Sequence, residues 1–189
     1  LIPFFFFLKA EASDAELENT VGMRGVWVST VGNLDFRQKQ GSTAEKDILK
    51  WKTYFLNILD KVEENNLNAI FFQVRPNNDA FYPSEYNAWS SYILGYGKDP
   101  GWDPLEWMVN ECHARGIEFH AWLNPYRISS GKITMNEVKN KYTDFRNNPA
   151  YKEENVLLSD TGAILDPGSP EVKEYLVDVI IRWIEKEIN

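Results

Sequence analysis

The stretch IEFHAWLNPYR, residues 117–127, changes character halfway along, and it decides the predicted fold. Its first half, up to Leu123, is apolar and aromatic and follows a helix-ending Gly116, which predicts a strand buried on both faces. Pro125 cannot continue a central strand, so the strand should end there. Polar side chains then follow at the carboxyl end of the strand, where α/β folds place binding and catalytic groups.

Two earlier stretches repeat this pattern of an apolar strand followed by polar residues. They are RGVWVSTVGNLD, residues 24–35, and AIFFQVRPNND, residues 69–79. Three strands that end in polar clusters predict one shared cleft. The side chains expected at or just beyond the strand ends are Ser29, Gln73, Arg75, Asn77, Asp79, Asn124, Tyr126 and Arg127, with His120 and Trp122 inside the third strand.

One helix separates each pair of predicted strands. The strands cover residues 24–30, 68–74 and 117–123, and the helices cover residues 44–65 and 103–115. This repeat predicts adjacent parallel strands in chain order with both helices on one side. No Gly-rich phosphate loop follows a strand, which disfavours a dinucleotide-binding sheet. The remaining predicted elements are a short helix at 136–142, a hairpin of 156–158 and 163–165, and a final helix capped by Ser169 and Pro170.

Three βα units are too few for a complete parallel barrel. An eight-stranded (β/α)8 barrel of the TIM type needs about 250 residues, and this sequence has 189. A three-stranded parallel sheet with two open edges would be a poor stopping point. The expected fold is therefore α/β, the first three βα units of a TIM-type barrel, truncated before the fourth strand.

Composition narrows the classes of partner. The net charge of −8 argues against nucleic acid, which requires clustered Lys and Arg, and favours neutral or cationic partners. Aromatic residues make up 14% of the chain, and their flat apolar faces suit stacking on sugar rings, although most Trp side chains are expected in the core.

Cysteine and histidine usage predicts neither a metal site nor a cofactor. Cys112 is the single cysteine, so no internal disulfide can form, and its place on the apolar side of a helix predicts a buried, inert thiol. His113 and His120 do not have the spacing of metal ligands. His120 is either a hydrogen-bonding residue near the cleft or a satisfied core histidine.

The first 13 residues, LIPFFFFLKAEAS, resemble the end of a secretory signal peptide. The apolar run is too short to span a membrane, and small residues near Ala12 suit cleavage. This predicts export to the periplasm, cell envelope or exterior, with residues 14–22 as a linker and 23–189 as the domain. The alternative is a hydrophobic tail that packs on the domain.

With these residues in hand, the chain resembles the glycosyl hydrolase-like 10 family of bacterial envelope proteins. The matching pieces, in order, are MRGVWVSTVGNLD at Met23, AIFFQVRPNNDAFYPS at Ala69, DPGWDPLEWMVNECHARGIEFHAWLNPYR at Asp99 and LDPGSPEV at Leu165. The resemblance implies a (β/α)8 barrel that hydrolyses O-glycosidic bonds, with cell-wall peptidoglycan glycan strands as the substrate class. It also implies a fourth strand ending in an Asp-Asp-Tyr motif, which this sequence does not reach before Asn189.

Glycoside hydrolysis generally uses two carboxyl groups about 5 to 10 Å apart. Asp79 is the best local candidate for one of them, with Arg75 beside it to keep it ionised. The alternative is that Asp79 only caps its loop. Asn77 and Asn124 carry the donors and acceptors that sugar hydroxyls require.

Trp122 and Tyr126 could stack on a sugar or fill the barrel mouth. The same cleft would also serve a carbohydrate-binding barrel without catalysis, and a scaffold role would require large exposed apolar patches. Linkage specificity, stereochemical outcome and oligomeric state are left open by the sequence.

Overall fold

The computed structural model describes residues 22–36, 44–141 and 152–188. The predicted signal peptide and nearly all of the predicted linker lie outside these residues. The described chain contains three small sheets and four α-helices, and the largest sheet, which is parallel, positions the candidate site.

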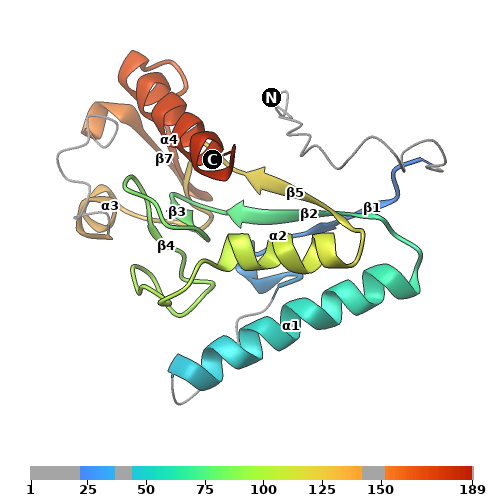
Figure 1. Cartoon of the computed structure of the whole chain (residues 1–189). Helices are drawn as coiled ribbons and strands as arrows, with labels where there is room; N and C mark the ends of the chain where they lie inside the picture. The colour runs from blue at the N-terminus through green and yellow to red at the C-terminus, as the bar shows by residue number, and fades with distance from the viewer. Residues whose placement is uncertain (1–21, 37–43, 142–151, 189) are drawn as a thin grey trace.

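The largest sheet consists of three parallel strands in chain order. They are β1 (Gly25–Val28), β2 (Ala69–Arg75) and β5 (Glu118–Leu123). Val26 lies beside Ile70, and Ile70 lies beside Phe119. The predicted arrangement of adjacent parallel strands is confirmed, and Figure 1 shows the three arrows side by side.

Both intervening helices cover one face of this sheet, as predicted (Figure 1). They are α1 (Ala44–Glu64) and α2 (Pro104–Ala114). Asp103 caps α2 by accepting hydrogen bonds from the backbone N–H groups of Leu105 and Glu106, which satisfies two otherwise unpaired donors. The core between sheet and helices includes Ile70, Phe72, Val74, Trp51, Phe55, Leu59, Leu105, Met108 and Cys112.

Cys112 is fully buried within this core on α2. Burial raises the pKa of its thiol to about 12, since the apolar surroundings disfavour the thiolate. The predicted buried thiol is therefore confirmed, and Cys112 is not a candidate nucleophile for the site.

The opposite face of the sheet carries a row of rings from all three strands. Phe71 stacks between Trp27, at 4.7 Å between ring centroids, and His120, at 4.5 Å. Trp122 meets Trp27 edge-on at 5.3 Å. Trp27 is nevertheless 48% exposed, so this aromatic face is open in the described part of the chain.

The prediction that the third strand is buried on both faces is wrong. Glu118 is exposed, and the rest of β5 is only partly buried. In the described residues β5 pairs with β2 alone and shares the open aromatic face, so its apolar composition exceeds its burial.

A second, antiparallel sheet follows, in the order β6-β8-β7. Its strands are β6 (Arg127–Ser129), β7 (Val156–Ser159) and β8 (Gly162–Leu165). The predicted hairpin corresponds to β7 and β8. Strand β6 was not predicted from the sequence, because three residues are too few to show alternation.

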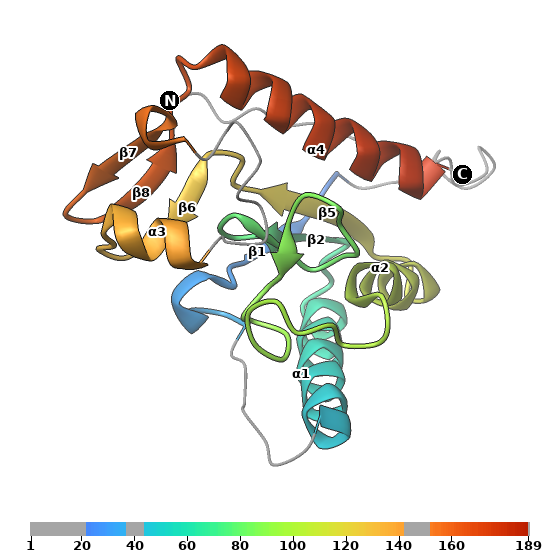
Figure 2. The same cartoon turned by 90° about the vertical axis from the view of Figure 1, so that its left-hand side faces the viewer.

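Two helices pack with this second sheet (Figure 2). The predicted short helix is α3 (Met135–Lys141), and the final helix is α4 (Pro170–Ile188). The Ser169 hydroxyl accepts a hydrogen bond from the backbone N–H of Val172, which is the predicted N-cap. A 3-10 turn, η5 (Glu153–Asn155), precedes β7. The shared core includes Ile128, Val138, Leu165, Val172, Leu176 and Val179.

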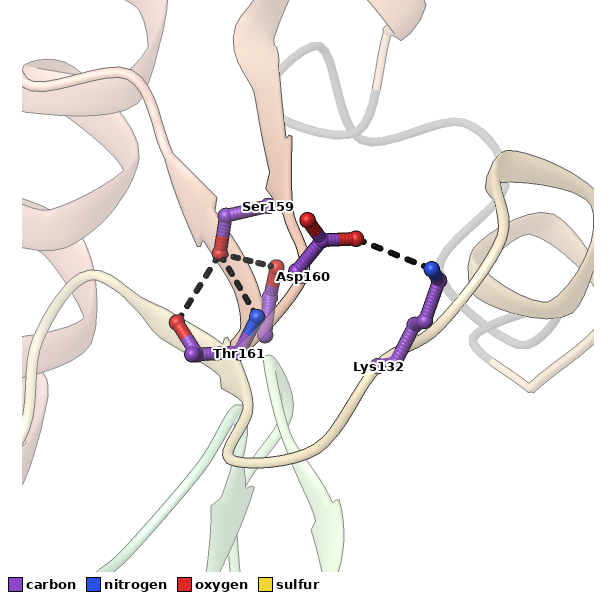
Figure 3. A network of polar contacts seen from close by, with 5 residues as sticks. Lys132, Ser159, Asp160 and Thr161 are labelled. Atoms are coloured by element: carbon purple, nitrogen blue, oxygen red, sulfur yellow. Dashed lines mark hydrogen bonds and ion pairs between the residues drawn. The ribbon is translucent and has the colours of Figure 1, made fainter.

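The turn between β7 and β8 is closed by its own side chains (Figure 3). Ser159 donates to the Gly162 carbonyl at 3.1 Å and accepts from the Thr161 backbone N–H at 3.3 Å. Asp160 points away toward Lys132 and forms an ion pair at 2.9 Å, which ties this turn to the segment after β6.

The aromatic segment between β2 and α2 contains two short strands that sequence patterning missed. They are β3 (Asp79–Ala80) and β4 (Ala88–Trp89), which pair in parallel.

Within the described residues, no helix is long and apolar enough to cross a membrane.

Candidate functional site

The carboxyl ends of β2 and β5 are joined by direct hydrogen bonds. The Asn124 backbone N–H donates to the Arg75 carbonyl at 3.0 Å. The Arg75 guanidinium in turn donates through Nη1 to the carbonyls of Asn124, at 2.8 Å, and Pro125, at 3.0 Å. The polar residues that the sequence placed after these two strands therefore lie at one edge of the sheet.

The carboxyl end of β1 joins the same edge through Gln73. Its Oε1 atom accepts hydrogen bonds from the backbone N–H groups of Thr30, at 3.0 Å, and Val31, at 2.9 Å, and from the Ser29 hydroxyl at 3.2 Å. These donors fix the orientation of the amide, because a reversed amide would bring Nε2 against two N–H groups. Gln73 is fully buried, and these hydrogen bonds hold the loop after β1 against the end of β2.

Arg75 is the largest fully buried side chain and is held by neutral oxygen atoms. Besides the two carbonyls, its Nε donates to Asn87 Oδ1 at 3.2 Å and its Nη2 donates to Asn78 Oδ1. Asn78 Oδ1 also accepts from the hydroxyl of Tyr175, at 3.3 Å, so α4 is linked to the end of β2. This network positions the loop that carries Asn77 and Asp79.

Tyr82 lies within this buried region. Burial raises the pKa of its hydroxyl to about 12, with Arg75 opposing the shift. Tyr82 is therefore neutral at physiological pH.

Asp79 is 2% exposed, and its two carboxylate oxygens accept different hydrogen bonds. Oδ1 accepts from the backbone N–H of Asn77 at 3.1 Å, and Oδ2 accepts from the Ser90 hydroxyl at 2.7 Å. This geometry closes the loop after β2 and fastens it to the end of β4. Such contacts are those of a loop cap, the alternative that the sequence left open.

The accessible rim surrounds the carbonyl of Pro76. Asn124 Nδ2 donates to this oxygen at 3.3 Å, and Arg127 Nη1 donates to it at 3.4 Å. Both side chains are partly exposed. The neighbouring Asn77 is buried, and its Oδ1 atom has no hydrogen-bond partner among the described residues.

Tyr92 lies in the aromatic segment between β2 and α2 and connects this segment to the turn after β1. Its hydroxyl accepts from the backbone N–H of Gly32, in the turn after β1, at 3.0 Å. The indole N–H of Trp51 donates to the Tyr92 carbonyl at 3.0 Å, which anchors the loop to α1. Burial lowers the pKa of Arg127, and the nearby Tyr92 opposes the shift.

The other predicted site residues have different surroundings. His120 stacks on Phe71, and its Nε2 lies 3.1 Å from a carboxylate oxygen of Glu118, toward the start of the strand. Trp122 belongs to the open aromatic face, and Tyr126 packs against the second core.

Sequence reasoning missed four residues that support the site. These are Asn78, Asn87, Ser90 and Tyr175. A signal existed for Tyr175, which lies three residues after Val172 and four before Val179 on one helix face. The two Asn residues and Ser90 lie in irregular segments without a period, where no pattern separates a buried amide from an exposed one.

Comparison with known proteins decides the family. Residues 22–187 match the family described as Glycosyl hydrolase-like 10. The chain belongs to this family. The resemblance seen in the sequence is therefore confirmed, and the match covers the parallel sheet, the site and the second sheet.

Two similar proteins illustrate how much of a longer protein the chain represents. Glycosyl hydrolase YngK of Bacillus subtilis is 37% identical over 173 residues, which are 90% of this chain and 31% of that protein. Glycosyl hydrolase DigH of Escherichia coli K12 is 30% identical over 172 residues, 87% of this chain and 39% of that protein. The chain thus spans between about a third and two fifths of these relatives.

The site residues of this family member contain no cluster of metal-binding character. Among the described residues, no group of three or more His, Cys, Asp or Glu side chains is arranged to hold a metal ion. This edge instead presents the Asn124 amide, the Arg127 guanidinium and the Tyr92 ring, which are groups suited to hydroxyls, anions and ring faces.

Proposed function

We propose that the protein is an exported glycoside hydrolase that cleaves O-glycosidic bonds in bacterial cell-wall peptidoglycan glycan strands or a related polysaccharide. The family assignment supports the hydrolase class, and both relatives carry the name glycosyl hydrolase. Export rests on the apolar first 13 residues, as argued from the sequence. The cell-wall substrate rests on the resemblance and on the polar, aromatic rim.

The observation that carries the proposal is the meeting of groups from the ends of β2 and β5 around the Pro76 carbonyl, with the loop after β1 joined to the same edge through Gln73. Asn124 and Arg127 donate to this oxygen from beyond β5, and Asn77 follows it from β2. Side chains at the carboxyl ends of parallel strands are where barrel enzymes bind substrate. Amides paired with hydroxyls, and rings beneath sugar faces, are the expected mode of glycan binding.

The proposal includes a complete (β/α)8 barrel in the full-length protein. The three parallel strands, with both helices on one side, would be its first three βα units. The open row of Trp27, Phe71, His120 and Trp122 would then become part of the barrel interior. Further strands would also pair with the edge of β5, which has β2 as its partner among the described residues.

A second candidate function is glycan binding without hydrolysis. The engagement of both Asp79 oxygens favours it, because a carboxyl group already bound to Asn77 and Ser90 is poorly placed to exchange a proton with a glycosidic oxygen. If the protein does hydrolyse glycans, its catalytic acid and base would have to come from outside the loops described above.

The two candidates differ in turnover. Purified full-length protein should release new reducing ends from glycan strands, with heat-inactivated protein as the control. Binding of the same strands with no reducing ends over hours would support the non-catalytic candidate. Failure to bind or cleave any glycan would contradict both.

A further inference from the structure

Arg127 has different partners from two other arginines, the buried Arg75 and the ion-paired Arg115. Arg75 is fully buried and donates to four neutral oxygen atoms. Arg115 bonds two carboxylates, Asp60 at 2.7 Å and Glu63 at 2.8 Å. Arg127 makes one long hydrogen bond of 3.4 Å to the Pro76 carbonyl, and within the described residues no carboxylate lies in ion-pair range of it.

A guanidinium carries five N–H donors, so most of those on Arg127 are not used by the described chain. The side chain is also partly removed from water, and this burial lowers its pKa. A partly desolvated cation with unused donors is stabilised by an anion.

The backbone of Arg127 is held in place by the second sheet and its core. Arg127 pairs with Ile164 of β8, and the next residue, Ile128, is fully buried in the second core. The guanidinium is therefore presented at a defined place on the rim rather than on a free loop. Its neighbours there are the Asn124 amide, which shares the Pro76 carbonyl, and Tyr92, which acts on Arg127 electrostatically.

These neighbours indicate what kind of anion fits. Asn124 offers a partly exposed amide, so a hydroxyl group is accommodated next to the cation. One planar guanidinium matches a single carboxylate in a bidentate pair. Arg75, the other cation at this edge, is committed to neutral acceptors, so a multiply charged phosphate would be poorly balanced.

We propose that Arg127 binds a carboxylate carried by a sugar unit of the glycan, so that the protein prefers acidic glycans over neutral ones. The inference rests on the proposed function and adds the substrate feature that is recognised. The net charge of −8 does not oppose it, since charges beyond about 8 Å are screened at physiological ionic strength and the contact is local.

The test compares two forms of one glycan. Strands with free carboxylates, such as the lactyl groups of muramic acid, are compared with the same strands after chemical reduction of those carboxylates to alcohols. We expect the full-length protein to favour the carboxylate form by about 10- to 100-fold in kcat/KM, because hydrogen bonds to a charged group are at stake. Binding affinity for the two forms provides a second readout that requires no turnover.

Substitutions assign the preference to the residue. In Arg127→Met the ratio between the two forms should fall toward one, and in Arg127→Lys it should be intermediate, since the charge stays and the bidentate geometry is lost. Lys132→Met is the matched control: it removes an exposed cation in the segment after β6, where Lys132 pairs with Asp160, and the ratio should stay at the wild-type value.

The outcomes separate the inference from the proposed function. Equal treatment of both forms by the wild type, or an unchanged ratio in Arg127→Met, would overturn the inference while leaving glycan hydrolysis intact. Carboxylate-dependent binding without cleavage would support the inference and contradict the hydrolase. Absence of binding to either form would overturn both.

Discussion

The hydrogen bonds of Asp79 make its role testable at the scale of one residue. Asp79→Asn keeps the shape and one acceptor oxygen for the Asn77 N–H, and the Ser90 hydroxyl can rotate to accept instead of donate. We therefore expect kcat on cell-wall glycan to fall only a few-fold. A fall of about 10²-fold or more, with the loss of one limb of the pH–rate profile, would instead identify Asp79 as a general acid or base.

Asn124 lies on the accessible rim, so its loss should affect substrate directly. Asn124→Ala removes the amide that donates to the Pro76 carbonyl and is available to sugar hydroxyls. Each lost hydrogen bond is worth about 0.5 to 1.5 kcal/mol, which corresponds to a two- to tenfold decrease in kcat/KM. Full activity of the protein with both the Asp79→Asn and Asn124→Ala changes would refute the site assignment.

The sequence predicted where several site residues lie, but not which of their polar atoms face solvent. Ser29, Arg75 and Asn124 could be placed at one edge of the sheet from the alternation of apolar strand and polar exit alone. Which of the polar atoms point outward could not be predicted. Gln73 and Asp79 look as polar as Asn124 in the sequence, yet burial and their hydrogen-bond partners make them supports of the loops.

At the scale of elements, the second sheet depends on a close approach between β6 and β8. A Cβ atom added at Gly162 would lie 2.3 Å from the backbone oxygen of Ser129, so Gly162→Ala must push the strands apart. We expect a loss of about 1 to 3 kcal/mol in stability, seen as a lower thermal unfolding midpoint. Gly131→Ala, where an added Cβ meets nothing within 4 Å, is the control and should change little.

The start of α4 gives a pH dependence. Glu171 accepts hydrogen bonds from Lys152 at 2.5 Å and from Asn155 at 2.7 Å, and the Lys152 bond is the main cause of its lowered pKa. A carboxyl with a lower pKa in the folded state stabilises the fold above its unfolded pKa and loses this contribution as pH falls through the folded value.

Glu171→Gln should therefore lower the unfolding midpoint slightly at pH 7, with the difference from wild type vanishing as the carboxyl becomes protonated in acid. The effect is small because the pair is exposed. Glu174→Gln makes the same change of charge on the exposed face of the same helix and is the control. A difference that persists unchanged at pH 3 would show that Glu171 acts through packing instead of its charge.

The element scale explains why the second sheet was only half predicted. The β7–β8 hairpin has two apolar runs on either side of a polar turn, a local signal. Strand β6 has three residues and exists because Ile128 fills the second core and Gly162 permits a close approach. Those causes are tertiary, and no window of sequence contains them.

At the scale of the whole molecule, the order and direction of the parallel strands followed from the strand–helix repeat, since the right-handed crossover leaves few alternatives. The burial of β5 did not follow. The apolar composition of a strand reflects the neighbours against which it is suited to pack. Its burial depends only on the neighbours that are present. The partly exposed residues of β5 and the 48% exposure of Trp27 thus describe one unsatisfied face.

That face determines how residues 20–189 should behave when expressed alone. Trp27, Phe71 and Trp122 would lie open on a sheet whose β5 edge is unpaired among the described residues, and such surfaces associate. We expect insoluble or molten material, measured by light scattering after size exclusion and by thermal unfolding.

The cause can be separated from general instability by two substitutions of exposed apolar residues. Trp27→Thr removes the 48% exposed ring that β1 contributes to the open face while keeping a residue suited to a strand, and it should raise the soluble fraction. Leu34→Thr changes a side chain that is 66% exposed, more than Trp27, but lies beyond β1 in the following loop, and it should not. A cooperative, monomeric unfolding transition for unsubstituted residues 20–189 would mean that the aromatic face needs no further strands, and the barrel proposed for the full-length protein would lose its physical argument.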